Sequence, residues 1–319
     1  MTNVLVTGGA GFIGRHLVDH LTKQGGYVVT VLDNESMGDR THLDLSRIRF
    51  VHGDLRNRGD LGSALEGQDA VVHLAADTRV MDSIEDPANN FDNNVVGSFK
   101  LLQMCQELGV GRVVAASTGG AILGDVRPPV HERMTPRPTS PYGASKLMLE
   151  GYLSAFASSY GLSSCALRFS NIYGPRSFHK GSVVAHFYKQ IIAGEPLVVY
   201  GDGTQARDFL YVGDLVEAIR TAIHRDVLGP CQLGSGEPTT VNEIIRLMST
   251  VTGRGLKVVH EDFRPGEVRE TWCQIDRARE TLGFTPTTTL EDGLRRTWDW
   301  FRDQGRDASP RPEAQPGLD

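Results

Sequence analysis

The stretch VLVTGGAGFIG, residues 4–14, decides the fold. Its first four residues favour a buried strand, and residues 14–24 carry apolar side chains at helical spacing. Gly8 permits a tight turn, Gly11 lets the backbone approach a ligand, and Gly14 lets helix and strand pack closely. The pattern therefore predicts a strand–turn–helix unit whose helix N-terminus offers free N–H groups and a positive dipole to a pyrophosphate.

A glycine turn could also serve packing alone, so the residues that follow it matter. Asp33 ends a second apolar strand, 19 residues after Gly14, where a carboxylate can hold the ribose hydroxyls of a dinucleotide. The same charge repels a 2′-phosphate and favours NAD over NADP, although Arg15 and Arg40 point mildly the other way. Asp54 follows the third strand and is either a contact of the adenine amine or a solvated loop residue.

Strand-like runs and amphipathic stretches alternate through the first half of the chain. This rhythm predicts an α/β fold with a doubly wound parallel sheet of the Rossmann type and a smaller α/β substrate domain. We expect the NAD-binding domain at residues 1–170, completed by about 205–228, and the substrate domain at 171–204 and 229–302. Residues 303–319 are polar and proline-bearing without a period, which is typical of a disordered tail.

Composition excludes several classes of protein. The chain has 319 residues and a net charge of −6, which argues against nucleic-acid binding. No apolar run reaches the roughly 20 residues of a membrane helix, and the first strand starts too early for a signal peptide. The four cysteines form no C-x-x-C pair, so we expect no metal site, reduced thiols and a cytoplasmic location.

Tyr142 and Lys146 are the expected catalytic pair. They stand four residues apart on a helix that Pro141 begins, so both lie on one face. A tyrosine phenol, with a pKa of about 10, is a poor base at neutral pH. A lysine ammonium one turn away and an oxidised nicotinamide both lower that pKa toward neutrality. The pair could otherwise be a surface pair, but its place after the fifth strand favours catalysis.

The chain resembles the extended short-chain dehydrogenase/reductases, and among them the NAD-dependent nucleotide-sugar epimerase/dehydratase family. The resemblance covers Val4 to about Phe301. It rests on TGGAGFIG (7–14), GDLR (53–56), HLAA (73–76), the tyrosine–lysine pair, LRFSNIYGPR (167–176), YGDGTQARDFLYVGD (200–214) and RPGEV (264–268).

The resemblance implies roles for individual residues. Thr118 is the expected hydroxyl that binds the reacting sugar oxygen, with Ser117 as its close alternative. Asn171, Arg207 and Arg264 are the expected contacts of the nucleotide diphosphate, and Glu267 is the expected contact of a nucleoside ribose. His73 is expected to be structural. The expected NAD contacts are Gly8, Gly11, Phe12, Ile13, Gly14, Asp33, Asn34, Asp54, Leu55, Leu74, Ala75, Ala76, Asn94, Tyr142 and Lys146.

The segment after the fifth strand selects among the family's reactions. Dehydratases carry Asp-Glu directly after the strand-five threonine, where this chain has Gly119 and Gly120. The resemblance therefore implies a 4-epimerase, acting on a UDP-hexose or UDP-hexuronic acid through a transient 4-keto intermediate, with hydride passing to and from NAD. Dehydratase, decarboxylase and reductase activities are the alternatives. Leu123 replaces a usual tyrosine, which could alter the pocket wall.

Three further expectations follow. A uronic substrate needs a cation, and Arg176, His179 and Lys180 are either that cation or solvent-facing residues. Helices at 89–108 and 141–160 correspond to those that pair as a four-helix bundle in family homodimers, although their apolar residues could equally face the sheet. A catalytically silent NAD-binding scaffold is the alternative of a different class.

Overall fold

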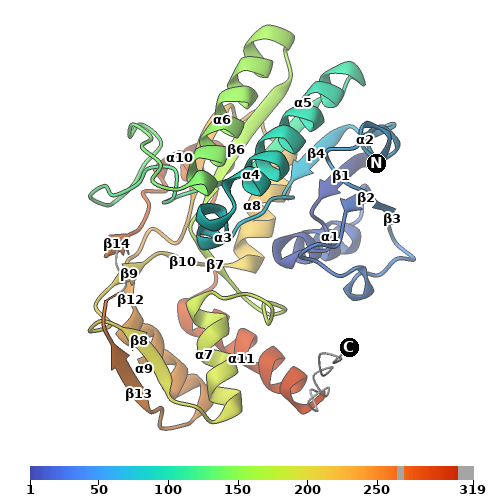
Figure 1. Ribbon diagram of the computed structural model, residues 1–319. Coiled ribbons are helices and arrows are strands. Elements are labelled where there is room, and N and C mark those ends of the chain that lie inside the picture. Colours follow the sequence, from blue (N-terminus) through green and yellow to red (C-terminus); the bar gives the residue numbers. More distant parts are fainter. Residues whose placement is uncertain (264–268, 308–319) are drawn as a thin grey trace, which may run out of the picture. The chain divides into compact units, whose positions relative to one another are not determined.

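The structure is a computed structural model and describes residues 1–263 and 269–307. Its larger compact unit comprises Met1–Ile172, Ala206–Thr239 and Val268–Thr288. A seven-stranded sheet in the order β11-β6-β5-β4-β1-β2-β3 forms its centre (Figure 1). Every pairing in the sheet is parallel, from β3 through β1 and β4 to β11. The strands are β1 (Thr2–Thr7), β2 (Tyr27–Asp33), β3 (Arg49–His52), β4 (Ala70–His73), β5 (Arg112–Thr118), β6 (Ser163–Phe169) and β11 (Gly229–Leu233).

The strand order reverses between β1 and β4, which makes this the doubly wound sheet that the sequence predicts. In such sheets ligands bind beyond the carboxyl ends of the strands, next to the reversal. Thr7, His73 and Thr118 are the last residues of β1, β4 and β5. The topology thus brings the glycine turn and the residues after β4 and β5 to one edge of the sheet.

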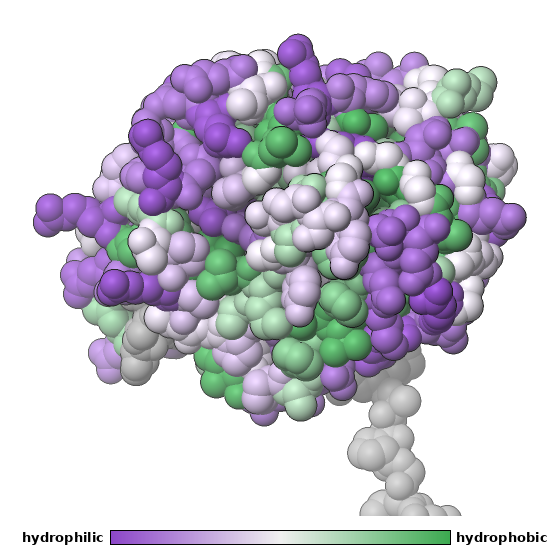
Figure 2. All heavy atoms as spheres, turned by 90° about the horizontal axis from the view of Figure 1, so that it is seen from above, coloured by the Kyte–Doolittle hydropathy of each residue, from purple (hydrophilic) through white to green (hydrophobic). Residues whose placement is uncertain are grey.

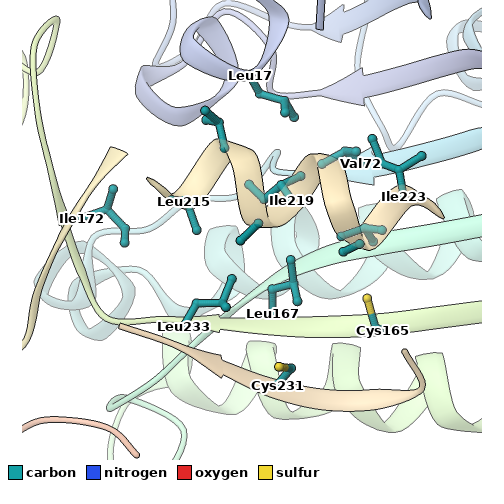
Figure 3. Close-up of a cluster of buried hydrophobic side chains, with 14 of the residues drawn as sticks. Leu17, Val72, Cys165, Leu167, Ile172, Leu215, Ile219, Ile223, Cys231 and Leu233 are labelled. Atoms are coloured by element: carbon teal, nitrogen blue, oxygen red, sulfur yellow. The ribbon is translucent and has the colours of Figure 1, made fainter. Parts of the chain in front are cut away.

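Helices cover both faces of the sheet, and side chains of β1 alternate between the two cores. Val4 and Val6 join the core under α1 and α8, where Leu17 and Ile219 lie (Figure 3). Leu5 joins the opposite core, under α2, α5 and α6. The helices are α1 (Phe12–Gln24), α8 (Val212–His224) and α10 (Asp276–Leu282) on the first face, and α2 (Arg58–Leu65), α5 (Gly97–Glu107) and α6 (Pro141–Tyr160) on the second.

Short elements carry the connections. A single run of helix contains α4 (Pro87–Phe91), a π-helical turn (Asp92–Val96) and α5, and the sequence predicts it as one helix. A π turn inserts one extra residue and is frequent at functional sites. The other short elements are a 3₁₀ turn (Arg40–His42), α3 (Val80–Glu85), β7 (Asn171–Tyr173), β9 (Ala206–Arg207), β10 (Phe209–Tyr211), β12 (Thr239–Thr240) and β14 (Glu270–Thr271).

The smaller unit comprises Tyr173–Gln205, Thr240–Glu267 and Thr289–Asp319. Two parallel strands, β8 and β13, lie beside its helices. Tyr188 is buried against Trp298 and Phe301, with ring centroids 5.5 and 5.6 Å apart, and its hydroxyl donates to the Leu294 carbonyl. The elements are α7 (Val183–Ala193), β8 (Leu197–Tyr200), α9 (Val241–Thr252), β13 (Val258–Glu261) and α11 (Leu290–Asp307).

These units differ from the expected boundaries in two places. Residues 229–239 and 268–288 belong to the larger unit, because β11 continues the main sheet by pairing with β6. The glycines and prolines around this strand suggest a loop-rich domain and hide a strand of only five residues. Helix α11 also runs to Asp307, five residues into the expected tail; residues 308–319 lie outside the described part.

Within residues 1–263 and 269–307, no helix is long and apolar enough to cross a membrane. In the same residues, His, Cys, Asp and Glu side chains do not gather in a group of three or more that could hold a metal ion.

Candidate functional site

Two glycines of the turn between β1 and α1, Gly8 and Gly14, have no room for side chains. A Cβ on Gly14 would lie 2.2 Å from the Gly8 carbonyl oxygen, and one on Gly8 would lie 2.6 Å from the Ala75 nitrogen. Gly8 also has a φ of +70°, which glycine adopts without strain. Gly11 begins α1 without a side-chain cap, so the first N–H groups of the helix, at Phe12 and Ile13, are not covered by a capping side chain. This is the cradle that a pyrophosphate needs.

Asp33 ends β2 beside this cradle. Its carboxylate accepts hydrogen bonds from the backbone N–H of Ala10 at 2.9 Å and of Glu35 at 2.7 Å. Burial raises the pKa of this carboxyl above its usual range. Each oxygen keeps a lone pair for a ribose hydroxyl. Arg40 ion-pairs with Glu35 and covers the Phe50 ring, so its charge is already paired.

The loop after β3 holds the expected adenine side. Asp54 makes two hydrogen bonds of 2.8 Å with the Arg56 guanidinium and accepts a third from the Asn34 amide at 3.1 Å. The Arg56 guanidinium holds the pKa of Asp54 well below its usual range. Leu55 packs against Gly97, where an added Cβ would lie 3.1 Å from the Leu55 Cβ. Asp54 is thus an ion-paired anion at the rim of the sheet.

His73 is structural, as the sequence predicts. It is 1% exposed, and burial lowers its pKa to about 3. The Ser98 hydroxyl donates to the Asn94 carbonyl, so the His73 Nε2–H must donate to Ser98 Oγ at 2.9 Å. Nδ1 then accepts from Thr7 Oγ1 at 2.8 Å, and Thr7 accepts from the Ala75 N–H at 3.3 Å. This chain of bonds fixes the neutral tautomer and ties β4 to β1.

Asn94 lies on the π turn and fixes the loop that follows β4. Its Oδ1 accepts from the Asp77 N–H at 2.7 Å, and its Nδ2 donates to the Asp77 carbonyl at 2.8 Å. Nδ2 also lies 3.2 Å from the Ser145 hydroxyl on α6. Asn94 therefore positions the segment Leu74–Asp77 against the helix that carries the tyrosine–lysine pair. The side chain is 3% exposed.

Tyr142 and Lys146 lie on one face of α6, at the end of β5. Lys146 is 4% exposed and donates from Nζ to the Ala116 carbonyl at 2.9 Å. Its Nζ lies 6.0 Å from the centre of the Tyr142 ring. Burial lowers the pKa of Lys146 to about 8 and raises the pKa of Tyr142 to about 12, while a hydrogen bond with Thr118 acts to lower the latter. Without NAD the tyrosine is thus a protonated phenol at neutral pH.

The two candidate hydroxyls at the end of β5 have different partners. Thr118 reaches Tyr142, whereas the Ser117 hydroxyl donates to Glu150 at 2.6 Å. Ser117 is 3% exposed and already bound. Thr118 is therefore the better candidate to meet a substrate. Sequence reasoning missed Glu150, although its spacing from Lys146 places it on the same helix face.

The loop after β5 is tightly packed. A Cβ on Gly119 would lie 3.0 Å from Gln232 Oε1, and one on Gly120 would lie 3.2 Å from Thr271 Cγ2. Leu123 is fully buried in the main core, so its replacement of a tyrosine affects core packing. The expectation that Leu123 alters a pocket wall is wrong for that reason.

The expected diphosphate contacts are only partly described. Asn171 donates from its N–H and its Nδ2 to the Asp208 carbonyl, at 2.9 and 3.2 Å. Arg207 is anchored from Nη1 to two carbonyls, those of Ala206 and Arg269. Asp208, which sequence reasoning missed, binds Ser235, Gly236 and Cys273 through its buried carboxylate. Arg264 and Glu267 lie outside the described residues.

The parallel, doubly wound sheet and the glycine turn define a protein of the dinucleotide-binding Rossmann class. The sequence model of the NAD dependent epimerase/dehydratase family matches residues 4–232. The chain belongs to that family and is therefore NAD-dependent.

Relatives match along nearly the whole chain. It is 34% identical to the UDP-glucose 4-epimerase of Mycolicibacterium smegmatis, covering 95% of this chain and 99% of that one. It is 32% identical to the UDP-glucuronate 4-epimerase of Thermodesulfobacterium geofontis, covering 94% and 96%. The structure resembles that of a UDP-glucose 4-epimerase from Thermotoga maritima with UDP-glucose, with a TM-score of 0.91, 38% identity and coverage of 95% and 99%.

Proposed function

We propose that this protein is a UDP-sugar 4-epimerase. The observation that carries the proposal is the Tyr142–Lys146 pair at the end of β5, followed by Gly119 and Gly120 instead of an acid–base pair. Elimination of water needs a further acid and base at these positions. Their absence argues against elimination and favours return of the hydride to the ketone. The relatives named above are 4-epimerases, which supports the same conclusion.

Each residue has a distinct task in this proposal. Tyr142 removes the proton of the sugar 4-hydroxyl and returns it after the ketone has turned over. Lys146 keeps two of its three N–H donors beyond the one at Ala116, and its charge lowers the pKa of Tyr142. Thr118 binds the reacting oxygen, and Asn171, Arg207, Arg264 and Glu267 bind the nucleotide.

NAD fits the cradle described above. The glycine turn of residues 8–14, the uncapped start of α1 and Asp33 would hold its pyrophosphate and ribose. Asn34, Asp54 and Leu55 would line its adenine side, and the segment Leu74–Ala76 its nicotinamide side. When bound, NAD accepts hydride from the sugar carbon and returns it. Two side chains of the centre, Tyr142 and Lys146, would meet the nicotinamide end.

A panel of UDP-, dTDP- and GDP-sugars, followed by proton NMR without added reductant, tests the proposal. Interconversion of UDP-glucose and UDP-galactose, or of their N-acetyl or uronic forms, is the expected result. A 4-keto-6-deoxy product, released carbon dioxide or stoichiometric NADH would instead reveal a dehydratase, a decarboxylase or a reductase. No change in any UDP-sugar would contradict the proposal, and failure of bound NAD to be reduced would indicate a silent scaffold.

The same panel separates neutral from uronic substrates. We propose Arg176, His179 and Lys180 as the cations for a uronic carboxylate. Burial lowers the pKa of Lys180 to about 8, so its charge weakens near that pH. If UDP-glucuronate is the substrate, Lys180→Met raises its KM and leaves any residual turnover of UDP-glucose unchanged. Equal effects on both sugars would contradict this assignment.

We also propose a homodimer through α5 and α6, which lie side by side (Figure 1). Phe99 contacts Tyr152 and Phe156, with ring centroids 5.1 and 6.1 Å apart. Phe99, Tyr152 and Tyr160 are 36%, 37% and 60% exposed, so α5 and α6 present neighbouring aromatic side chains to solvent. Contiguous exposed apolar surface of this kind often marks a protein–protein contact. Figure 2 shows apolar residues among hydrophilic ones on the face seen from above. Light scattering of the wild type and of Phe99→Glu tests this: a dimer that Phe99→Glu dissociates is expected.

A cytoplasmic location is proposed on chemical grounds. All four cysteines are buried free thiols, which fits a reducing compartment. Fractionation of the cells that make the protein would test this, and recovery outside the cytoplasm would contradict it.

A further inference from the structure

A buried charged cluster lies behind the tyrosine–lysine pair, on the face of the sheet that α6 covers. Glu150 follows Lys146 by four residues, as Lys146 follows Tyr142, so all three share one helix face. Arg168 on β6 donates to the Glu150 carboxylate from Nε at 2.8 Å and from Nη2 at 2.7 Å. The Ser117 hydroxyl donates to the same carboxylate at 2.6 Å. The side chains of Arg168 and Glu150 are 2% and 9% exposed, so the whole ion pair is out of water.

The cluster is a poor device for stability. A buried ion pair gains little over apolar residues of equal volume, because both charges lose their hydration. Its polar groups are also incompletely paired: Arg168 Nη1 and both amide atoms of Gln232 have no hydrogen-bond partner among the described residues. Gln232 pairs with Arg168, and Arg168 with Ser117, on adjacent strands of the sheet. A row of buried polar side chains that adds little stability indicates a functional role for the cluster at the neighbouring tyrosine–lysine pair.

Glu150 is the anion of the cluster that acts on Lys146. Lys146 has neighbours from three elements. Tyr142 and Glu150 share its face of α6, and the Ala116 carbonyl of β5 accepts its hydrogen bond. His73 of β4 is neutral. From β6, Arg168 faces Glu150, and Asp77 after β4 acts on Tyr142. Burial lowers the pKa of Lys146, and Glu150 is the charge that opposes this effect.

We propose that Glu150 is a positioning residue of this centre, which keeps Lys146 charged and seated at the Ala116 carbonyl, and that Arg168 and Ser117 hold Glu150 in place. The proposal rests on the role proposed for Tyr142 and Lys146. Its physical basis is that a charged ammonium both lowers the pKa of the neighbouring phenol and can donate to the nicotinamide ribose. A neutral amine has no charge with which to lower the pKa of the phenol, and it is a weaker hydrogen-bond donor.

Glu150→Gln tests the proposal, since it removes the charge and keeps the shape. The readout is the pKa of Lys146, measured from the carbon-13 shift of its Cε against pH and assigned with Lys146→Met. We expect that pKa to fall by about one unit and the basic limb of the epimerase pH profile to move equally far down. Glu107→Gln, which removes an exposed partner of Arg58 on α5, is the matched control and leaves both unchanged.

Glu150→Gln could unfold the protein, because it leaves Arg168 buried without its partner. The double variant Glu150→Gln/Arg168→Met removes both charges, so Lys146 still lacks its anion but meets no unpaired cation. The pKa of Lys146 is expected to fall there too, by less than in the single variant. Folding and NAD retention are checked for each variant. A folded variant in which Lys146 titrates as in the wild type would overturn the proposal. The NMR titration needs no turnover, so its result stands even if no UDP-sugar is epimerised.

Discussion

The glycine turn at Gly8–Gly14 and the tyrosine–lysine centre on α6 lie at the same edge of one sheet and are built in opposite ways. In the turn the chain removes side chains, so that backbone N–H groups and carbonyls are the working surface. On α6 the working groups are side chains, and burial shifts the pKa of both Tyr142 and Lys146. In the proposed function the turn binds NAD through its backbone shape, and the pair on α6 reacts through its charges.

This difference predicts how each region fails. A substitution of a glycine in the turn creates a clash with the backbone. Both the free energy of unfolding and the affinity for NAD are then expected to fall. A substitution on α6 changes a proton or a charge while the fold persists. The first two experiments below test whether the two kinds of failure stay separate, and the third concerns His73, which ties β4 to β1 beside both regions.

The largest effect is expected for Tyr142→Phe. The variant loses the group that takes the 4-hydroxyl proton, so turnover falls by about a thousandfold or more. The fold and bound NAD are retained, because the phenyl ring keeps its packing. Initial rates by coupled assay and the NAD content after gel filtration measure both quantities. Tyr152→Phe, on an exposed position of the same helix, is the control and keeps its activity; full activity of Tyr142→Phe would remove this tyrosine from the mechanism.

A smaller effect, on stability instead of chemistry, is expected for Gly14→Ala. The added Cβ would meet the Gly8 carbonyl oxygen at 2.2 Å, and neither backbone segment can move easily. The free energy of unfolding should fall by about 3 kcal/mol, and NAD should be lost with it. Gly151→Ala is the matched control, since nothing lies within 4 Å of its added Cβ and alanine stabilises a helix by about 0.5–1 kcal/mol. Equal urea midpoints for the two variants would show that the turn tolerates side chains.

The smallest of the three effects concerns pH. His73 has a folded pKa of about 3, below its ordinary value of about 6.5. The unfolded chain therefore takes up a proton that the folded chain refuses, so this stability is complete above about pH 6.5 and is lost as the pH falls toward 3. Between pH 7 and 5 the free energy of unfolding should drop by about 2 kcal/mol from this group. His73→Asn should flatten that part of the urea-derived curve, while the exposed His224→Asn should not; parallel curves would contradict the assignment.

Six of the seven strands of the main sheet, and the helices that cover them, were predictable because their local signals agree. The glycines of the turn have a recognisable spacing, and the apolar residues of the strands and helices recur at the spacing of each element. The short strand Gly229–Leu233 was not predictable, since its pairing with β6 depends on a contact between residues far apart in the chain. The π turn was also hidden, because a single inserted residue hardly changes the apolar pattern of a helix.

The site divides in the same way. Tyr142, Lys146 and the glycines are visible as motifs with a fixed spacing. The distinction between Thr118 and Ser117 was not visible, because it depends on Glu150 binding one of the two hydroxyls. Likewise, the buried carboxylate of Asp208 organises a loop from a distant part of the sequence. Motifs report the groups that react, and the groups that hold them emerge only from the fold.

The π turn at Asp92–Val96 changes which side chains face the same way before and after it in the helical run from α4 to α5. An α-helix advances about 100° per residue, so one inserted residue rotates everything that follows it by that angle. Asn94, inside the turn, reaches the loop after β4, while Leu101 and Leu102 beyond it pack into the core. Removing one residue here would leave an unbroken α-helix in which only one of these two faces could be satisfied. The number of residues in this helical run therefore fixes the angle between the face that carries Asn94 and the face that packs into the core. An insertion or deletion here would disturb the protein as much as a change of residue type.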